Sequence, residues 1–388
     1  MATVEATGIL TRSESHRWLH SRDWDLTFIT LSVMLVTFPY LVYLGLVQFE
    51  VVLGPAASAL HTTVDDLSRN IVNGVVALLV GIPHTFSTFS RTRFDRDYVR
   101  THRTMIHLSI IPPILVIGLA LFSLPLLLTV FFFWASIHTL HQIVYVSELY
   151  NRRQPSTLPG WSRTLDYALI LTALYPIAAY RLVNGNFIIG LNDISAVVAG
   201  MAGSVGITIG PWVVWLAGGA FGLALVAWIA KSVVEWRRRQ FNWPKTLFIG
   251  IWAAVAFFVP ALANLDSAFQ GLNIWHSTQY LALTWMLNNL RQQRGDLDEK
   301  PFLRRLSEQG SARRYYLFNM GLAAANVVVA IGVFFILYRI NGGFDYALDR
   351  AYYIGILSFL WIHYLHDHFL FAEPALVEFD PAVVPAPA

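Results

Sequence analysis

Apolar stretches long enough to cross a lipid bilayer recur along almost the whole of this 388-residue chain. A helix needs roughly 20 residues to span a hydrocarbon core of about 30 Å. Only 13% of the residues are charged and the mean hydropathy is +0.52, so the bilayer is the solvent in which this chain folds. We predict an all-α, polytopic transmembrane bundle of about ten spans, at residues 26–47, 70–90, 105–122, 125–150, 165–182, 211–230, 246–262, 272–290, 316–338 and 351–371.

The basic residues give an independent indication of topology. Short cytoplasmic loops are rich in Lys and Arg, whereas loops on the opposite side are not. If the N-terminus is inside, all of the 27 basic residues except Arg69, Arg181, Arg339 and Arg350 fall in inner segments. We therefore expect an even number of spans with both termini in the cytoplasm. The isoelectric point near 9.1 then reflects membrane topology, and no nucleic-acid partner is expected.

No predicted loop is long enough to form a soluble domain. The N-terminus also lacks the pattern of a cleaved signal peptide. We predict a cytoplasmic N-terminal segment at 1–25, a single transmembrane domain at 26–372 and a disordered tail at 373–388. The glycine-rich stretch 184–210 is expected to be an outer surface loop, with a short re-entrant or interfacial helix as the alternative.

The residue content limits the chemistry that the chain can perform. It contains no cysteine, which excludes disulfides, thiolate metal sites and iron–sulfur clusters. Any metal must therefore be held by nitrogen and oxygen. Most of the 12 histidines lie in or at predicted spans, where a polar side chain is costly and usually marks a functional site.

The span at 125–150 carries the strongest pattern. His138, His141, Tyr145 and Glu148 are spaced by three, four and three residues, which places them on one face of a helix. Two imidazoles at positions i and i+3 can bind the same metal ion, with a carboxylate nearby as ligand or hydrogen-bond acceptor. We predict both histidines as metal ligands, and Tyr145 and Glu148 as the residues that handle protons.

Three other spans contribute histidines. In the last span His363, His366 and Asp367 share a face, while His368 points elsewhere. His276 shares a face with Asn273, Gln279 and Tyr280, and His84 follows Pro83 on a face with Asn73, Thr88 and Arg91. The predicted metal ligands are His84, His138, His141, His276, His363, His366 and His368.

Histidine with a few carboxylates suits iron, zinc, copper or manganese, and geometry must choose among them. We favour one or two non-haem iron ions because 13 Trp, 16 Tyr and 26 Phe surround the histidines like the walls of an oxidase. Aromatic walls suit a long apolar or polyene substrate, although membrane interfaces and helix contacts account for many of these residues.

The motif GIPH with His84, the His138/His141 pair, His276 and the final histidine-rich span together resemble the bacterial beta-carotene dioxygenase family (Brp/Blh). The resemblance covers scattered motifs between residues 80 and 370. It implies a multi-span membrane fold in which histidines hold a non-haem iron that splits a carotenoid with dioxygen. By position His84, His138 or His141, and His276 would be the matching ligands, and Thr85 stands where the family favours glycine.

The histidine content is also similar to that of integral-membrane di-iron desaturases, hydroxylases and alkane monooxygenases. Those proteins use His-x-x-x-His and His-x-x-His-His boxes, whereas this chain has His-x-x-His and His-x-x-His-Asp-His.

We therefore expect an iron-dependent oxygenase or oxidase of the bacterial cytoplasmic membrane. Dioxygen would be its co-substrate, a lipophilic substrate would enter laterally from the bilayer, and a redox partner would supply electrons if the reaction consumes them. Two other classes stay open. One is a bis-histidine haem electron carrier. The other is a metal-ion or proton transporter with a histidine relay, which would spread its histidines along a path instead of gathering them in one cluster.

Overall fold

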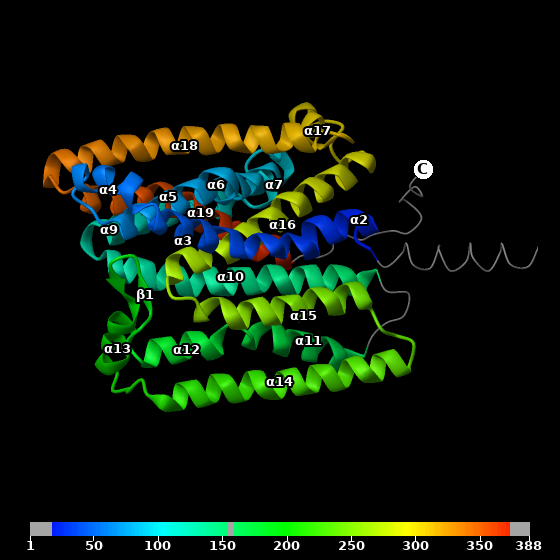
Figure 1. The fold of residues 1–388 in the computed structure, drawn as a ribbon. Helices are drawn as coiled ribbons and strands as arrows, with labels where there is room; N and C mark the ends of the chain where they lie inside the picture. The colour runs from blue at the N-terminus through cyan, green and yellow to red at the C-terminus, as the bar shows by residue number, and fades with distance from the viewer. Residues whose placement is uncertain (1–17, 154–158, 373–388) are drawn as a thin grey trace, which may run out of the picture.

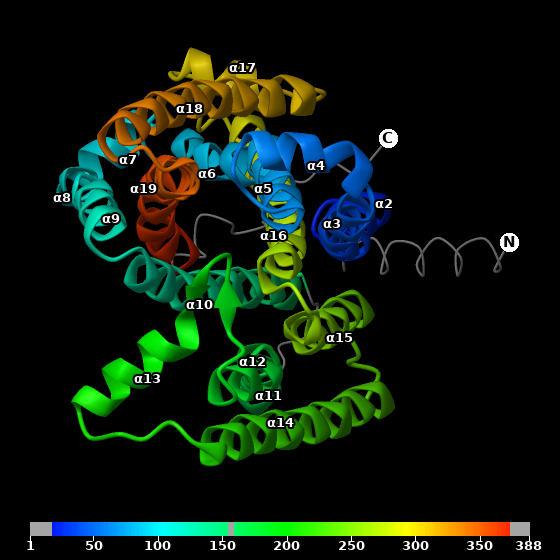
Figure 2. The same ribbon diagram turned by 60° about the vertical axis from the view of Figure 1, so that its left-hand side comes forward.

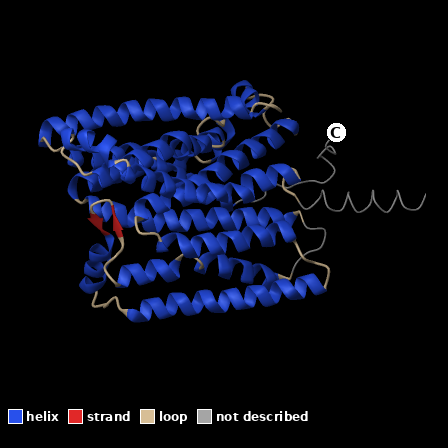
Figure 3. Ribbon diagram, in the orientation of Figure 1, coloured by secondary structure: helices blue, strands red, loops and turns tan. Residues whose placement is uncertain are grey.

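The computed structural model describes residues 18–153 and 159–372. Within these residues the strands are confined to one antiparallel hairpin, β1 (Ile188–Ile189) and β2 (Asn192–Asp193), and nearly everything else is helical (Figure 3). The all-α prediction is therefore confirmed. The predicted tail at 373–388 and most of the N-terminal segment at 1–25 lie outside the described residues.

The longest helices run side by side along one common direction (Figure 1). They are α10 (Leu124–Arg152), α14 (Pro211–Arg237), α15 (Trp243–Phe258), α16 (Leu265–Gln293), α18 (Ala312–Asn341) and α19 (Phe344–Ala372). We call the end where α10, α14, α16 and α19 finish the basic end, because the predicted inner loops lie there. The opposite end, which carries β1 and β2, is the hairpin end (Figure 1).

The N-terminal part contains two irregular spans. The first is built from α2 (Arg22–Trp24), η1 (Asp25–Thr30), η2 (Leu31–Thr37) and α3 (Phe38–Gln48), and α4 (Glu50–Ala59) follows it. The second is built from α5 (Val64–Val76), the π-helical turn η3 (Ala77–Gly81), α6 (Ile82–Ser87) and η4 (Thr88–Ser90). Pro83 has no amide hydrogen to donate, which disturbs the regular hydrogen bonding of the helix just before His84.

The remaining elements connect or cover the long helices. They are α7 (Arg96–Thr101), α8 (Arg103–Leu108), α9 (Ile111–Phe122), α11 (Gly160–Thr172), α12 (Tyr175–Val183), α13 (Ile194–Ser204), η5 (Val259–Ala261) and α17 (Pro301–Ser307). The stretch 184–210, expected to be a loop or a short interfacial helix, contains both the β hairpin and α13. Figure 2 shows α13 outside the bundle.

Seven helical stretches of the described chain are long and apolar enough to cross a membrane, against ten predicted. They are Arg22–Gln48, Val64–Ser90, Arg103–Phe122, Leu124–Arg152, Pro211–Arg237, Trp243–Ala261 and Ala312–Asn341. The predicted span at 165–182 is broken between α11 and α12, where Pro176 begins a new helix. The spans predicted at 272–290 and 351–371 are the long helices α16 and α19. Their polar residues bring the mean hydropathy of these two helices below the value expected of a membrane span.

Helix α16 lies at the centre of the bundle, which explains why it can be polar. It packs against the first span so closely that a Cβ added to Gly271 would lie 2.0 Å from the carbonyl oxygen of Val36. Its indole and amide groups also bond to that span, because Trp275 Nε1 and Gln279 Nε2 donate to the Ile29 carbonyl at 3.2 and 2.6 Å. A helix shielded from lipid in this way can carry polar side chains on its inner faces.

Candidate metal centre

Four histidines from four separate helices meet in the middle of the bundle. His84 comes from α6, His138 from α10, His276 from α16 and His363 from α19, and none is more than 6% exposed. His84 lies 4.8 Å from His363 and 5.1 Å from His276 between ring centroids. His138 lies 4.8 Å from His363 and 5.0 Å from His276. The rings therefore form a closed square in which each ring neighbours two others.

The orientation of His84 is fixed by a short polar chain on α16. Its Nδ1 lies 2.8 Å from the Ser277 hydroxyl, and that hydroxyl donates to Asn273 Oδ1 at 3.1 Å. Because the Ser277 hydroxyl donates its only hydrogen to Asn273, it must accept from His84. The His84 ring therefore carries its hydrogen on Nδ1. The lone pair of His84 is then on Nε2.

The orientation of His363 is fixed by a second group of polar side chains. Tyr280 and Thr88 donate to Asp367 Oδ1 at 2.6 and 3.2 Å. The Thr88 hydroxyl lies 2.5 Å from His363 Nδ1, and Asp367 Oδ2 lies 3.5 Å from the same nitrogen. Since Thr88 donates to the carboxylate, His363 donates from Nδ1 and its lone pair is on Nε2.

With these tautomers, several imidazole nitrogens present a lone pair that needs a hydrogen-bond donor or a cation. His363 Nε2 lies 3.2 Å from His138 Nε2, close to the roughly 3.3 Å expected between two nitrogens on one tetrahedral metal ion. Among the described residues, His84 Nε2 and His276 Nδ1 are buried without any hydrogen-bond partner. Buried polar atoms are rarely left unpaired. Ligand atoms of His84, His276 and His363 lie within 4.8 Å of one another, as do those of His138, His363 and Asp367, so the cluster fits a transition-metal ion.

Three predicted ligands lie elsewhere. His366 is bonded at both ring nitrogens, to the Tyr98 hydroxyl at 3.1 Å and the Ser109 hydroxyl at 2.9 Å. His141 and His368 pair with each other at 5.6 Å between ring centroids, and His368 is exposed. A shift of three residues turns a helical side chain by about 60°, which directs His141 and His366 away from the histidines one turn before them.

The two residues predicted to handle protons are also placed apart from the four-histidine cluster. Tyr145 is buried and stacks on Phe371 at 4.7 Å, and Phe371 lies 6.1 Å from His138. Glu148 accepts hydrogen bonds from Arg163 and Tyr167, and from Asn151 at 2.7 Å. Its carboxylate is therefore engaged near the basic end of α10 and contacts none of the four histidines.

Ser277 is a functional residue that the sequence pattern does not reveal. Its contact with His84 spans 193 residues, and a serine next to a histidine is an uninformative pattern. Tyr280 and Thr88 had been noted only as polar neighbours on their helices. Their bonds to Asp367 assign them the task of orienting His363.

A cavity of about 480 Å³ reaches the cluster, and His84 and His276 form part of its lining. On one side of α10 and α16 it is lined by residues of α10, α12 and α14, such as Phe132, Ala178 and Leu216. We call this part the apolar arm. On the other side it is lined by residues of η3, α6, α16 and α19, including Asp266, Gln270, Asn273, Tyr352 and Tyr353, and we call this part the polar arm.

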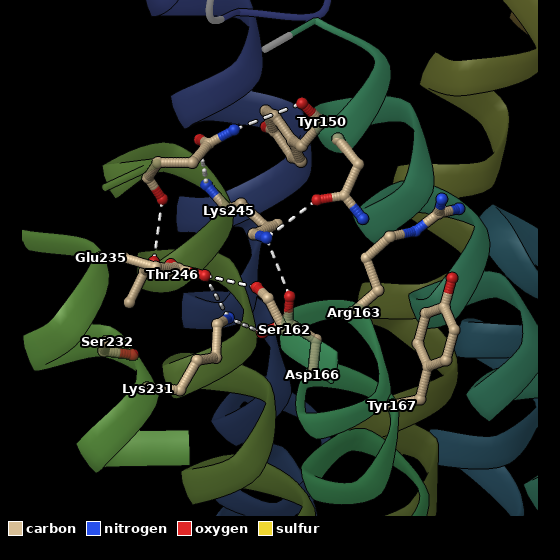
Figure 4. Close-up of polar contacts among 12 residues, drawn as sticks. Tyr150, Ser162, Arg163, Asp166, Tyr167, Lys231, Ser232, Glu235, Lys245 and Thr246 are labelled. Carbon is tan, nitrogen blue, oxygen red and sulfur yellow. Dashed lines mark hydrogen bonds and ion pairs between the residues drawn. The ribbon is translucent and has the colours of Figure 1, made fainter. Parts of the chain in front are cut away.

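A second buried polar cluster lies at the basic end and is not part of the cavity lining (Figure 4). Asp166 of α11 pairs with Lys231 of α14 and with Lys245 of α15, the latter at 2.8 Å. Lys231 also lies 3.5 Å from Glu235, which accepts a hydrogen bond from Ser162. Two lysines and two carboxylates balance in charge, so we interpret this cluster as an anchor that joins α14 to its neighbours.

Comparisons with protein-family models, with curated proteins and with solved structures found no match to this chain.

Proposed function

We propose that this integral membrane protein is a non-haem iron oxygenase or oxidase that acts on a lipophilic substrate. His84, His138, His276 and His363 would together hold one iron ion. The observation that carries the proposal is the convergence of four buried imidazoles, two of them with unpartnered nitrogens, at the wall of a largely apolar cavity. When bound, iron would supply the activation of dioxygen, for which amino-acid side chains are unsuited.

The donor set favours one ion over two. The two groups of described residues that could hold a metal share His363, and Asp367 is the only carboxylate in them. Its Oδ1 accepts from Tyr280 and Thr88, and its Oδ2 lies 3.5 Å from His363 Nδ1. His363 Nδ1 faces this group, which leaves only Nε2 available for a metal. Asp367 and Thr88 would then act on the ion through His363, by fixing the tautomer and orientation of its ring.

The clustering of the histidines also bears on the alternative functions. Two axial imidazole nitrogens of a haem lie roughly 4 Å apart, on opposite faces of a porphyrin. His138 and His363 are closer than this, and the rings of His84 and His276 stand where a porphyrin would have to pass. A relay that crosses the membrane would need histidines at many depths, whereas these four touch one another.

The apolar arm supports a lipophilic substrate. Its lining includes Phe133 and Leu216, which are 48% and 64% exposed at the lipid-facing surface of the bundle. A volume of about 480 Å³ suits an alkyl or polyene chain. Entry between α10 and α14 would let the substrate pass from the bilayer to the histidines without crossing water.

The resemblance to the beta-carotene dioxygenase family agrees with this proposal. Three of its matching positions, His84, His138 and His276, belong to the cluster. We propose the bacterial cytoplasmic membrane as the location, with the basic end facing the cytoplasm and a redox partner docking there if the reaction consumes electrons.

Elemental analysis and a visible spectrum of protein purified in detergent and loaded anaerobically with Fe²⁺ test the proposal. We expect one iron per chain, no Soret band, and dioxygen consumption on addition of a polyene or long-chain alkyl substrate. A Soret band would indicate the haem carrier instead. Failure to retain any metal would reject the iron centre.

A further inference from the structure

A row of polar side chains runs along the face of α16 that lines the polar arm of the cavity. Asn273 Nδ2 donates to Gln270 Oε1 at 3.0 Å, and Asn273 in turn accepts from Ser277, which holds His84. Asp266 stands one turn before Gln270. These residues recur at the helical repeat, so a continuous row of oxygen atoms leads from the hairpin end of α16 to the histidine cluster.

The second span, which faces α16 here, leaves room beside this row of oxygen atoms. Gly81 lies opposite Asn273, where an added Cβ would be 3.4 Å from Asn273 Nδ2. On the same face of the second span, Ala77 lines the cavity, and Asn73 lies one turn further toward the hairpin end. Asn73 is 3% exposed and its Oδ1 is among the buried oxygen atoms that have no partner in the described structure. A buried amide oxygen without a partner therefore lies one helical turn beyond the lining residue Ala77.

At its hairpin end the polar arm reaches Asp266, which belongs to a buried group of charged side chains. Arg69 is buried between two carboxylates, with Nη1 3.0 Å from Asp266 Oδ2 and Nη2 3.3 Å from Asp66 Oδ1. Asp349 of α19 interacts electrostatically with this group as well. One guanidinium therefore faces three carboxylates. An excess of carboxylates over guanidinium groups favours cations at this end of the arm.

We propose that the polar arm is the route by which the metal ion reaches the four histidines from the hairpin end. The inference rests on the proposed metal centre. A buried metal site requires an entry path as well as ligands. The apolar arm offers a cation only neutral hydroxyls, such as those of Ser136 and Thr139, whereas the polar arm offers the Asp266 carboxylate at its hairpin end and amide oxygens further in. Carboxylate and amide oxygens are the hard ligands that a divalent ion exchanges for water.

The test measures the rates of metal binding and not catalysis. Apoprotein is mixed with Co²⁺, whose visible absorption changes on coordination by imidazole, and release is followed after addition of excess EDTA. Gln270→Met removes one amide of the route and keeps the shape of the side chain. Because Gln270 contacts none of the four histidines, we expect association and dissociation to slow by a similar factor of about ten, with the affinity unchanged.

Two further variants make the result specific. Gly81→Leu introduces a side chain into the arm without removing any polar atom, and it should slow both rates in the same way. Gln279→Met makes the same chemical change on the same helix, but Gln279 bonds to Ile29 and Gln142 outside the cavity lining, so its rates should equal those of the wild type.

The outcomes separate the two proposals. If the wild type fails to bind Co²⁺, the metal centre itself is rejected and the route with it. If the wild type binds Co²⁺ and both Gln270→Met and Gly81→Leu bind and release it at wild-type rates, the centre stands and the route is rejected. A loss of affinity in Gln270→Met with an unchanged association rate would also reject the route, because it would make Gln270 part of the site.

Discussion

The Nε2 atoms of His138 and His363 lie 3.2 Å apart although 225 residues separate them in the chain. Thr88 and Asp367 hold the His363 ring by its opposite nitrogen, so this close approach does not depend on the two histidines alone. Two nitrogen lone pairs at this distance repel unless a proton or a cation lies between them. The pair is therefore the most sensitive place at which to test for metal.

Replacing either residue of this pair should remove the metal. We expect His138→Ala and His363→Ala to retain less than about one tenth of the wild-type metal content after dialysis, because each loses one of four ligands. The measurement is elemental analysis of purified protein. His368→Ala is the control, since His368 is exposed and pairs only with His141 and Phe369, and it should bind metal normally.

The hydroxyl of Thr88 should matter for affinity, although Thr88 is not a proposed ligand. Thr88→Val keeps the shape of the side chain but leaves His363 Nδ1 and Asp367 without the group that joins them. We expect metal affinity to fall roughly 10- to 100-fold. Competition with a chelator of known affinity measures the change. Thr88→Ser restores the hydroxyl and should recover most of the affinity, whereas equal losses in both variants would indicate a packing effect.

The buried charges at the basic end should be sensitive to removal of a single partner. Asp166→Leu leaves Lys231 and Lys245 without their shared carboxylate, and an uncompensated buried charge costs about 3–5 kcal/mol. We expect a large fall in the thermal midpoint, measured by size-exclusion chromatography of heated samples. Arg163→Gln provides the comparison: Arg163 is 47% exposed in its pair with Glu148, and loss of such a pair costs about 0–1 kcal/mol.

Asp95, in the connection before α7, should contribute a pH-dependent part of the stability. It is buried, which opposes ionisation, but hydrogen bonds from Lys300 at 2.7 Å and Arg291 at 2.5 Å lower its pKa below the usual value. The stabilisation is therefore fully present above the unfolded pKa of about 3.9 and is lost as the pH falls through the lower, folded value.

The variant Asp95→Asn isolates this contribution. The difference in thermal midpoint between wild type and variant should be constant from about pH 7 to pH 5. It should shrink below about pH 4, where Asp95 takes up a proton first in the unfolded chain and, at lower pH, in the folded protein. A difference that stays constant at the lowest pH would show that the carboxylate charge is not responsible.

The sequence predicted the candidate site well where local spacing was enough and poorly where it was not. His84, His138, His276 and His363 stand out because polar residues are rare in apolar helices. His141 and His366 stand out for the same reason, and the sequence cannot separate them from the others. The separation depends on which face of each helix points inward, and this is set by neighbours such as Ser109, Tyr98 and Phe371 that come from other parts of the chain.

The count of spans shows the same limit. Composition identifies helices that face lipid, because their hydropathy is high on all sides. The helices α16 and α19 are less hydropathic than this, because other helices shield them from lipid and they carry polar residues of the candidate metal centre. Pro176 gave a local reason to expect the break between α11 and α12. No local pattern indicates that α12 and α14 together form a wall of the cavity.

The sequence alone determined that this protein is an all-α membrane bundle and that histidine is its unusual intramembrane residue. Both follow from the cost of placing polar groups in a hydrocarbon solvent, which acts on every residue separately. Only the tertiary structure decided which four histidines meet, which nitrogen of His84 and of His363 is free, and which side chains line the two arms of the cavity. These depend on the rotation and packing of helices far apart in the chain, and no local pattern encodes the angle at which one helix faces another.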